Sequence, residues 1–187
     1  MLNSLRPILK KILEPIAKKI GINPNIITLI SLLIAILSAI SIGTSHKLLG
    51  AVLILLSGFF DVLDGETARY HNKTSKFGAI LDSTMDRFSD AVIVLGFIYV
   101  GYIDWFIGVL AIHAGFMVSY IRSSSEAKGI SNDVGIAERA VRLIILMASL
   151  LVGIIDTTYI QFVVVFLVIS SYFTVVQRLI HSWKHGR

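Results

Sequence analysis

The sequence contains no cysteine, only three prolines and little charge, since 16% of its 187 residues are charged. The absence of cysteine excludes disulfide bonds, thiolate metal ligands and a cysteine nucleophile. By contrast, 55% of the residues are hydrophobic, and the mean hydropathy is +0.80. This composition is too apolar for an ordinary soluble domain and is typical of a polytopic membrane protein.

Long apolar segments fill most of the chain. A membrane-spanning helix needs roughly 20 predominantly apolar residues. Six segments fit that length: 25–43, 48–71, 77–101, 104–127, 137–155 and 158–182. They leave no room for a separate soluble domain. We therefore predict an all-α integral membrane protein that forms a single domain over residues 1–187, with a six-helix bundle at 23–187.

The first 22 residues have a different pattern. Apolar side chains recur at helical spacing, with lysines between them, at Leu5, Ile8, Leu9, Ile12, Leu13, Ile16 and Ile20. The segment has no long apolar core and no small-residue cleavage site, so it does not read as a signal peptide. We predict a basic amphipathic helix on the inner membrane surface. Asn23 is the expected cap of the first span, and Pro24 suits its first turn.

Positive charge is distributed unevenly along the chain. Lysine and arginine concentrate in residues 1–24, 69–76, 122–142 and 178–187. The intervening loops hold Lys47 and the acids Asp104 and Asp156. By the positive-inside rule, both termini and the basic segments face the cytoplasm. An even number of spans agrees with this orientation, and we expect the protein in the cell membrane.

Four acids interrupt the apolar pattern: Asp61, Asp64, Asp82 and Asp86. Apolar runs flank them at 53–60 and 91–100. Ionisable groups in membrane-spanning segments are energetically expensive and usually mark function. Four converging carboxylates without a cation would repel one another and mostly protonate. A bound divalent metal ion is therefore the expected compensation.

The spacing of these acids places them on two helix faces. On the first helix, the positions i, i+3, i+4 and i+7 are Asp61, Asp64, Gly65 and Ala68. On the second helix, the positions i, i+4, i+8 and i+12 are Gly78, Asp82, Asp86 and Asp90. A short basic loop joins the two helices, so we predict an antiparallel hairpin that brings four carboxylates to one depth. Oxygen-only ligands suit Mg²⁺, Mn²⁺ or Ca²⁺, and four carboxylates are enough for two ions.

Small residues accompany the acids. Gly65 and Gly78 lack a side chain that would keep a ligand away, and Ala68 is small. Arg69 at the rim is suited to bidentate phosphate contact. In the alternative, purely structural interpretation the acids pair with neighbouring cations. We disfavour it because four acids at this spacing are flanked by facing glycines.

The pattern Asp61-x-x-Asp64-Gly65-x-x-Ala68-Arg69, followed after eight residues by Gly78-x-x-x-Asp82-x-x-x-Asp86, resembles the complete signature of the CDP-alcohol phosphotransferase family. With the six-span layout, the likeness covers nearly the whole chain. It implies transfer of a phosphatidyl-type group from a CDP-lipid to an alcohol, with release of CMP. The implied metal ligands, for Mg²⁺ or Mn²⁺ and two ions, are Asp61, Asp64, Asp82 and Asp86, and Asp86 is also the implied general base. The implied CDP-lipid residues are Asn25, Thr28, Gly65, Ala68, Arg69 and Gly78.

Two cationic segments, 120–126 and 135–142, are candidates for binding a phosphate of the acceptor alcohol. With Asp82-Ser-Thr-Met-Asp-Arg87, they are similar to the phosphatidylinositol-phosphate and archaetidylinositol-phosphate synthase branch of the family. The likeness implies myo-inositol 1-phosphate as the acceptor and CDP-diacylglycerol or CDP-archaeol as the donor. The expected acceptor-phosphate residues are Lys76, Arg122, Arg139 and Arg142. Alternatively, the arginines only mark topology and pair with Glu138. Ser123–Ser125 departs from a stretch that is often richer in arginine and alanine.

Other functions remain open at this stage. Glycerol 3-phosphate is the second acceptor candidate. A divalent-cation transporter is the candidate from another class, but it should carry polar residues in both membrane halves, whereas here the acids cluster in the cytoplasmic half. The family resemblance further implies a homodimer surrounded by membrane lipids, and no nucleic acid partner is expected.

Overall fold

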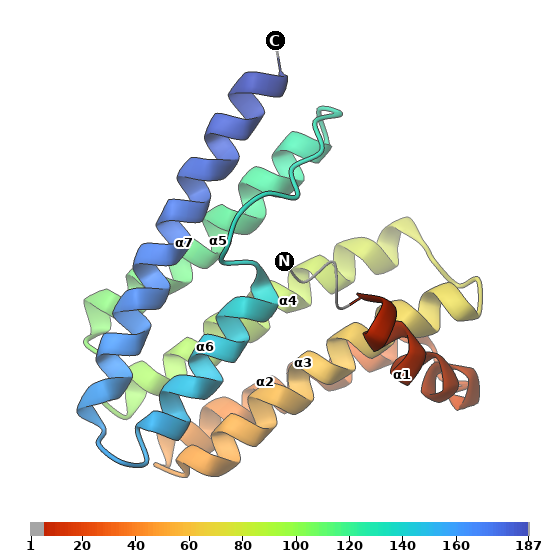
Figure 1. Cartoon of the computed structure of the whole chain (residues 1–187). Helices are drawn as coiled ribbons and strands as arrows, with labels where there is room; N and C mark the ends of the chain where they lie inside the picture. Colours follow the sequence, from red (N-terminus) through yellow and green to blue (C-terminus); the bar gives the residue numbers. More distant parts are fainter. Residues whose placement is uncertain (1–5, 187) are drawn as a thin grey trace.

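A computed structural model describes residues 6–186, with side chains from Leu13 onward. These residues form seven α-helices and no strand (Figure 1). The helices are α1 Arg6–Lys19, α2 Pro24–Gly43, α3 Lys47–Tyr70, α4 Lys76–Tyr99, α5 Trp105–Glu126, α6 Arg139–Val152 and α7 Thr158–His185. The last six agree with the six predicted segments to within three residues at each end.

Four of these helices are long and apolar enough to cross a membrane: α2, α3, α5 and α7. Helix α4 has sufficient length but carries charged side chains along its first four turns. Helix α6 has 14 residues, which extend about 21 Å at 1.5 Å per residue. This is shorter than the roughly 30 Å hydrocarbon core of a bilayer. The chain is thus a multi-pass membrane protein with four candidate spans among its described helices, and the crossing of α4 and α6 stays a prediction.

Helix α1 packs on α3. Leu13 and Ala17 are buried against Leu63, with Ile16 and Ile20 at the edge of the same cluster. The predicted apolar positions from Leu5 to Ile12 lie outside the described side chains. The placement of α1 on a membrane surface therefore stays a prediction.

Helix α2 lies between α3 and α4 and packs closely on both, whereas α3 and α4 contact each other little. Serines mediate the contact with α3: Ser31 Oγ donates to Ser57 O at 2.9 Å, and Ser57 Oγ donates to Ser31 O at 3.0 Å. Small residues allow such close approach of helices in lipid. A short loop joins α3 and α4 as predicted, but both helices pack mainly on α2 and contact each other little.

Gly96 is a point of close backbone approach between α4 and α2. An added Cβ would lie 2.7 Å from Ala39 O and 3.0 Å from Ala39 Cα, both backbone atoms that cannot rotate away. We expect Gly96→Ala to push the helices apart and to lower stability by about 1–3 kcal/mol, measured as a fall in unfolding temperature in detergent. Gly58→Ala in α3 is the control, since its Cβ would meet only Leu143 Cδ1 at 3.5 Å. Equal unfolding temperatures for the two variants would contradict the close-contact argument.

Candidate functional site

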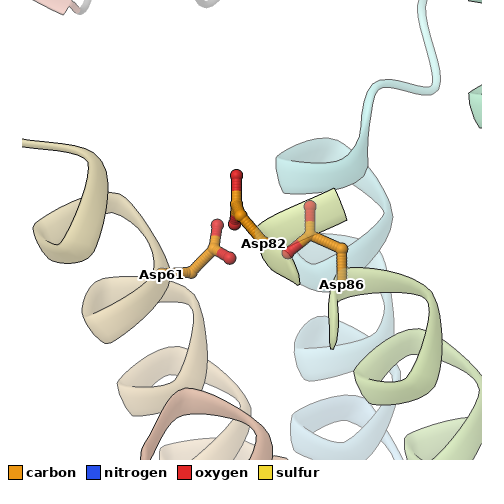
Figure 2. Close-up of side chains that lie close together, drawn as sticks. All are labelled: Asp61, Asp82 and Asp86. Atoms are coloured by element: carbon orange, nitrogen blue, oxygen red, sulfur yellow. The ribbon is translucent and has the colours of Figure 1, made fainter. Parts of the chain in front are cut away.

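Three of the four predicted acids converge. Asp61 of α3 and Asp82 and Asp86 of α4 each offer one carboxylate oxygen, and these oxygens lie within 4.8 Å of one another. Figure 2 shows the three side chains pointing toward a common space between their helices. All three are partly buried. Since the donors are carboxylate oxygens only, the arrangement fits a hard divalent cation such as Mg²⁺ or Mn²⁺.

Asp64 is placed differently. Its side chain is buried, with 4% of the residue exposed. Thr28 Oγ1 of α2 donates to Asp64 Oδ2 at 2.5 Å. The Asp64 carboxylate is not among the three that come within 4.8 Å. The structure therefore brings three of the four carboxylates together and holds the fourth against α2, so a metal-ligand role for Asp64 stays a prediction.

Two arginines of α6 reach the acids. Arg139 Nη1 lies 2.5 Å from Asp61 Oδ2 and 2.9 Å from Asp86 Oδ1. Arg139 Nε lies 3.3 Å from Asp90 Oδ1, and Arg142 Nη2 lies 2.5 Å from Asp90 Oδ2. Arg139 Nη2 is buried without a hydrogen-bond partner. The first turn of α6 thus adds positive charge directly to the acidic cluster.

A cavity of about 140 Å³ adjoins the acids, between α2, the end of α3, the 71–75 loop and the start of α4. Asp64 and Asp82 belong to its wall. The wall also contains all six residues that the resemblance assigns to the CDP-lipid: Asn25, Thr28, Gly65, Ala68, Arg69 and Gly78. Residues from three helices, far apart in the sequence, therefore surround one cavity.

Glycines and helix caps shape this cavity. A Cβ on Gly78 would lie 3.0 Å from Ser75 Oγ and 3.3 Å from Asn25 Oδ1. Ser75 Oγ accepts from Gly78 N at 2.9 Å and thereby caps α4. At the opposite wall, the guanidinium of Arg69 lies over Gly65, where a Cβ would be 3.3 Å from Nη2. Asn23 Oδ1 caps α2 by accepting from Asn25 N at 3.0 Å, as the sequence predicted.

The remaining predicted phosphate-binding residues lie away from the acids. Arg122 pairs with Glu126 at 2.8 Å and with Asp133 at 2.7 Å, and its side chain is 41% exposed. Lys76 is exposed at the start of α4 and does not line the cavity. The structure therefore joins Arg139 and Arg142 to the acidic cluster but leaves Arg122 and Lys76 outside it.

Arg178 of α7 is a buried cation that sequence reasoning missed. Its guanidinium donates to Val118 O at 2.5 Å and to Val134 O at 2.9 Å. It lies close enough to Arg122 and Arg142 for their charges to repel it. From the sequence, a single arginine near the end of an apolar helix cannot be told apart from a topology marker.

An apolar groove of about 230 Å³ lies between α3 and α6. Its wall comes mainly from α3 and α6, with Leu13 of α1 at one side. Val62 and Ala140 in this wall directly follow Asp61 and Arg139 in the sequence. The helices that carry Asp61 and Arg139 thus also form a surface suited to hydrocarbon.

The chain resembles known proteins along nearly its full length. Residues 21–177 match the family model described as CDP-alcohol phosphatidyltransferase. An archaetidylinositol phosphate synthase of Methanothermobacter thermautotrophicus is 40% identical over 98% of this chain and 95% of its own length. A phosphatidylinositol phosphate synthase of Corynebacterium glutamicum is 33% identical over 92% of this chain and 84% of its own.

Comparison with solved structures also finds phosphatidylinositol phosphate synthases. The phosphatidylinositol phosphate synthase of Mycobacterium tuberculosis with CDP-DAG bound superposes with a TM-score of 0.80 at 27% identity, covering 92% of this chain and 94% of that one. The same enzyme in complex with manganese and citrate gives a TM-score of 0.79 at 27% identity, with 90% and 88% covered.

Proposed function

The chain belongs to the CDP-alcohol phosphatidyltransferase family, and we propose that it transfers a phosphatidyl- or archaetidyl-type group from a CDP-lipid to myo-inositol 1-phosphate, with release of CMP. It is a metal-dependent membrane enzyme. One observation carries the proposal: Asp82 belongs both to the three convergent carboxylates and to the wall of a cavity that contains every residue assigned to the CDP-lipid. The names of the relatives support the inositol phosphate acceptor.

The donor would occupy the cavity and the groove together. Gly65, Ala68 and Gly78 leave room for the cytidine, and Arg69 can donate two hydrogen bonds to a phosphate. The groove between α3 and α6 would take the hydrocarbon chains, because it is apolar and its wall contains Val62, the residue that follows Asp61 in the sequence. The reacting pyrophosphate would then lie between these two regions, next to the carboxylates.

The carboxylates would hold the metal. Asp61, Asp82 and Asp86 converge, and Asp64 is one helical turn from Asp61. We propose two ions, because four carboxylates can hold two. When bound, divalent cations neutralise the charge that develops on the pyrophosphate oxygens.

The chain's own groups would complete the reaction. The acceptor hydroxyl forms a bond to the β-phosphorus, and the bond from that phosphorus to the bridging oxygen breaks, so that CMP leaves. Asp86 would take the hydroxyl proton. Arg139, whose Nη2 is buried and unpaired, would bind the acceptor phosphate with Arg142. Arg122 and Arg178 would add positive charge farther out, with Lys76 at the edge.

The placement in the membrane is also part of the proposal. We propose that all six helices from α2 to α7 cross the bilayer and that the acidic cluster faces the cytoplasm of the cell. The basic loops on the side of the cluster support this orientation. The single domain over 1–187 and the homodimer stay predictions, and the dimer can be tested by measuring mass in detergent.

The test compares acceptors with purified enzyme, Mn²⁺ and a CDP-lipid of either ester or ether type. CMP release is expected to be at least about tenfold faster with myo-inositol 1-phosphate than with free inositol, because a charged phosphate contact is lost. Faster release with glycerol 3-phosphate would overturn the acceptor assignment. Metal uptake into vesicles without any CMP release would favour a cation transporter instead.

A further inference from the structure

Asp90 is an acid of α4 that lies one turn beyond Asp86. It belongs to neither the predicted metal ligands nor the predicted substrate residues. Its side chain is 17% exposed, and its two oxygens have different partners. Oδ1 faces Arg139 Nε at 3.3 Å, and Oδ2 faces Arg142 Nη2 at 2.5 Å. One carboxylate therefore links both arginines at the start of α6.

Arg142 depends on this carboxylate. The residue is 5% exposed, and a buried guanidinium requires both a counter-charge and hydrogen-bond acceptors. Within the described part of the chain, its one ion pair is with Asp90. Its other hydrogen bond goes to Ala137 O at 3.2 Å. The direction of the Arg142 guanidinium is thus set largely by Asp90.

Arg139 is shared between two kinds of partner. Asp90 holds its Nε, while Asp61 and Asp86 hold its Nη1. A guanidinium and a divalent cation compete for the negative charge of the same two carboxylates, Asp61 and Asp86. Without Asp90, the remaining partners of Arg139 would be those two carboxylates, and the competition would become stronger.

We propose that Asp90 is a positioning residue that holds Arg139 and Arg142 at the acceptor side of the acidic cluster and so leaves Asp61 and Asp86 available to the metal ion. The proposal rests on the proposed function. Asp90 touches neither substrate nor metal in this role and acts through the two arginines. Partners of this kind, one step removed from the ligands, typically change metal affinity or activity by about 10–100-fold.

The first measurement is Mn²⁺ binding to the detergent-purified protein without substrates, by electron paramagnetic resonance of free Mn²⁺. Asp90→Asn is expected to weaken binding roughly tenfold. Arg139→Gln is expected to strengthen it, since it removes the competing cation. In the Arg139→Gln background, adding Asp90→Asn should have a much smaller effect. An equal loss in both backgrounds would show that only the charge matters and would overturn coupling through Arg139.

The second measurement separates the substrates. Asp90→Asn is expected to raise KM for myo-inositol 1-phosphate about tenfold, with little change in KM for the CDP-lipid. Asp90→Glu keeps the charge and should recover part of both losses. Asp156→Asn is the matched acid-to-amide control, because Asp156 follows the opposite end of α6 from Arg139. Its Oδ1 accepts from Thr158 N, and an asparagine oxygen can accept the same hydrogen bond.

The fold of each variant is checked by its unfolding temperature and its elution in detergent. If Asp90→Asn does not fold, Asp90→Glu serves in the same comparison, with a smaller shift in the same direction expected. If Asp90→Asn and Asp90→Glu both bind Mn²⁺ and myo-inositol 1-phosphate as the wild type does, the proposed role of Asp90 is overturned. Wild-type protein that binds Mn²⁺ but releases no CMP with any acceptor would refute the proposed function, and the Mn²⁺ comparison would still test Asp90.

Discussion

Asp86→Asn is expected to lower the rate of CMP release by about 10²–10⁴, while the CDP-lipid still binds. An asparagine oxygen can still contact a cation, but it cannot take a proton from the acceptor hydroxyl. The family resemblance implies this role for Asp86, which lies within the convergent cluster and contacts Arg139, the proposed acceptor-phosphate residue. The measurement is steady-state CMP release, with a separate binding assay for CDP-lipid.

Metal concentration distinguishes the two roles that Asp86 could have. If Asp86 is the base, raising Mn²⁺ to saturation leaves the Asp86→Asn rate low. Full recovery at high Mn²⁺ would show that Asp86 acts only as a metal ligand. Asp156→Asn again serves as the control for the chemical change itself, and its rate should equal that of the wild type.

Removing the metal is expected to abolish CMP release, and adding Mg²⁺ or Mn²⁺ is expected to restore it. Within the cluster, Asp61→Asn should raise the Mn²⁺ concentration needed for half-maximal rate by at least roughly tenfold. The reason is that Asp61 supplies the only α3 carboxylate oxygen among the three that converge. A titration of rate against Mn²⁺ checks both statements.

Asp61→Asn and Asp86→Asn are expected to differ in their rates of CMP release at saturating Mn²⁺. At saturating Mn²⁺, Asp61→Asn should regain a large fraction of the wild-type rate, because its defect is in binding the ion. An unchanged Mn²⁺ titration for Asp61→Asn would remove Asp61 from the metal site. Activity that survives complete chelation would contradict metal dependence altogether.

Much of the fold was predictable because the pattern of apolar residues along the chain marks each helix locally. Apolar runs separated by short polar breaks placed six helices to within three residues at each end. Composition could not decide how many of them span a bilayer, since α4 is charged and α6 is short. Among the helices that the structure describes, α2, α3, α5 and α7 have the length and hydropathy of a span.

The helical spacing also predicted much of the site. Residues at i, i+4 and i+8 share a face whatever the tertiary structure, so Asp82 and Asp86 had to project together. Asp61 joined them as expected. Asp64 did not, because its Oδ2 accepts a hydrogen bond from Thr28 Oγ1 of α2 at 2.5 Å. That contact depends on α2 lying between α3 and α4, which no periodicity within α3 could reveal.

By itself, the sequence determined the helix positions and the shared faces of the acids, since both follow from the pattern within each segment. The family resemblance added the six residues that line the cavity beside Asp82. The tertiary structure alone decided that Arg139 and Arg142 enter the acidic cluster and that Asp90 links them. These partners are about 50 residues apart in the chain. Only the packing of α6 against the bundle brings their charges within ion-pair distance, where mutual compensation makes their burial tolerable.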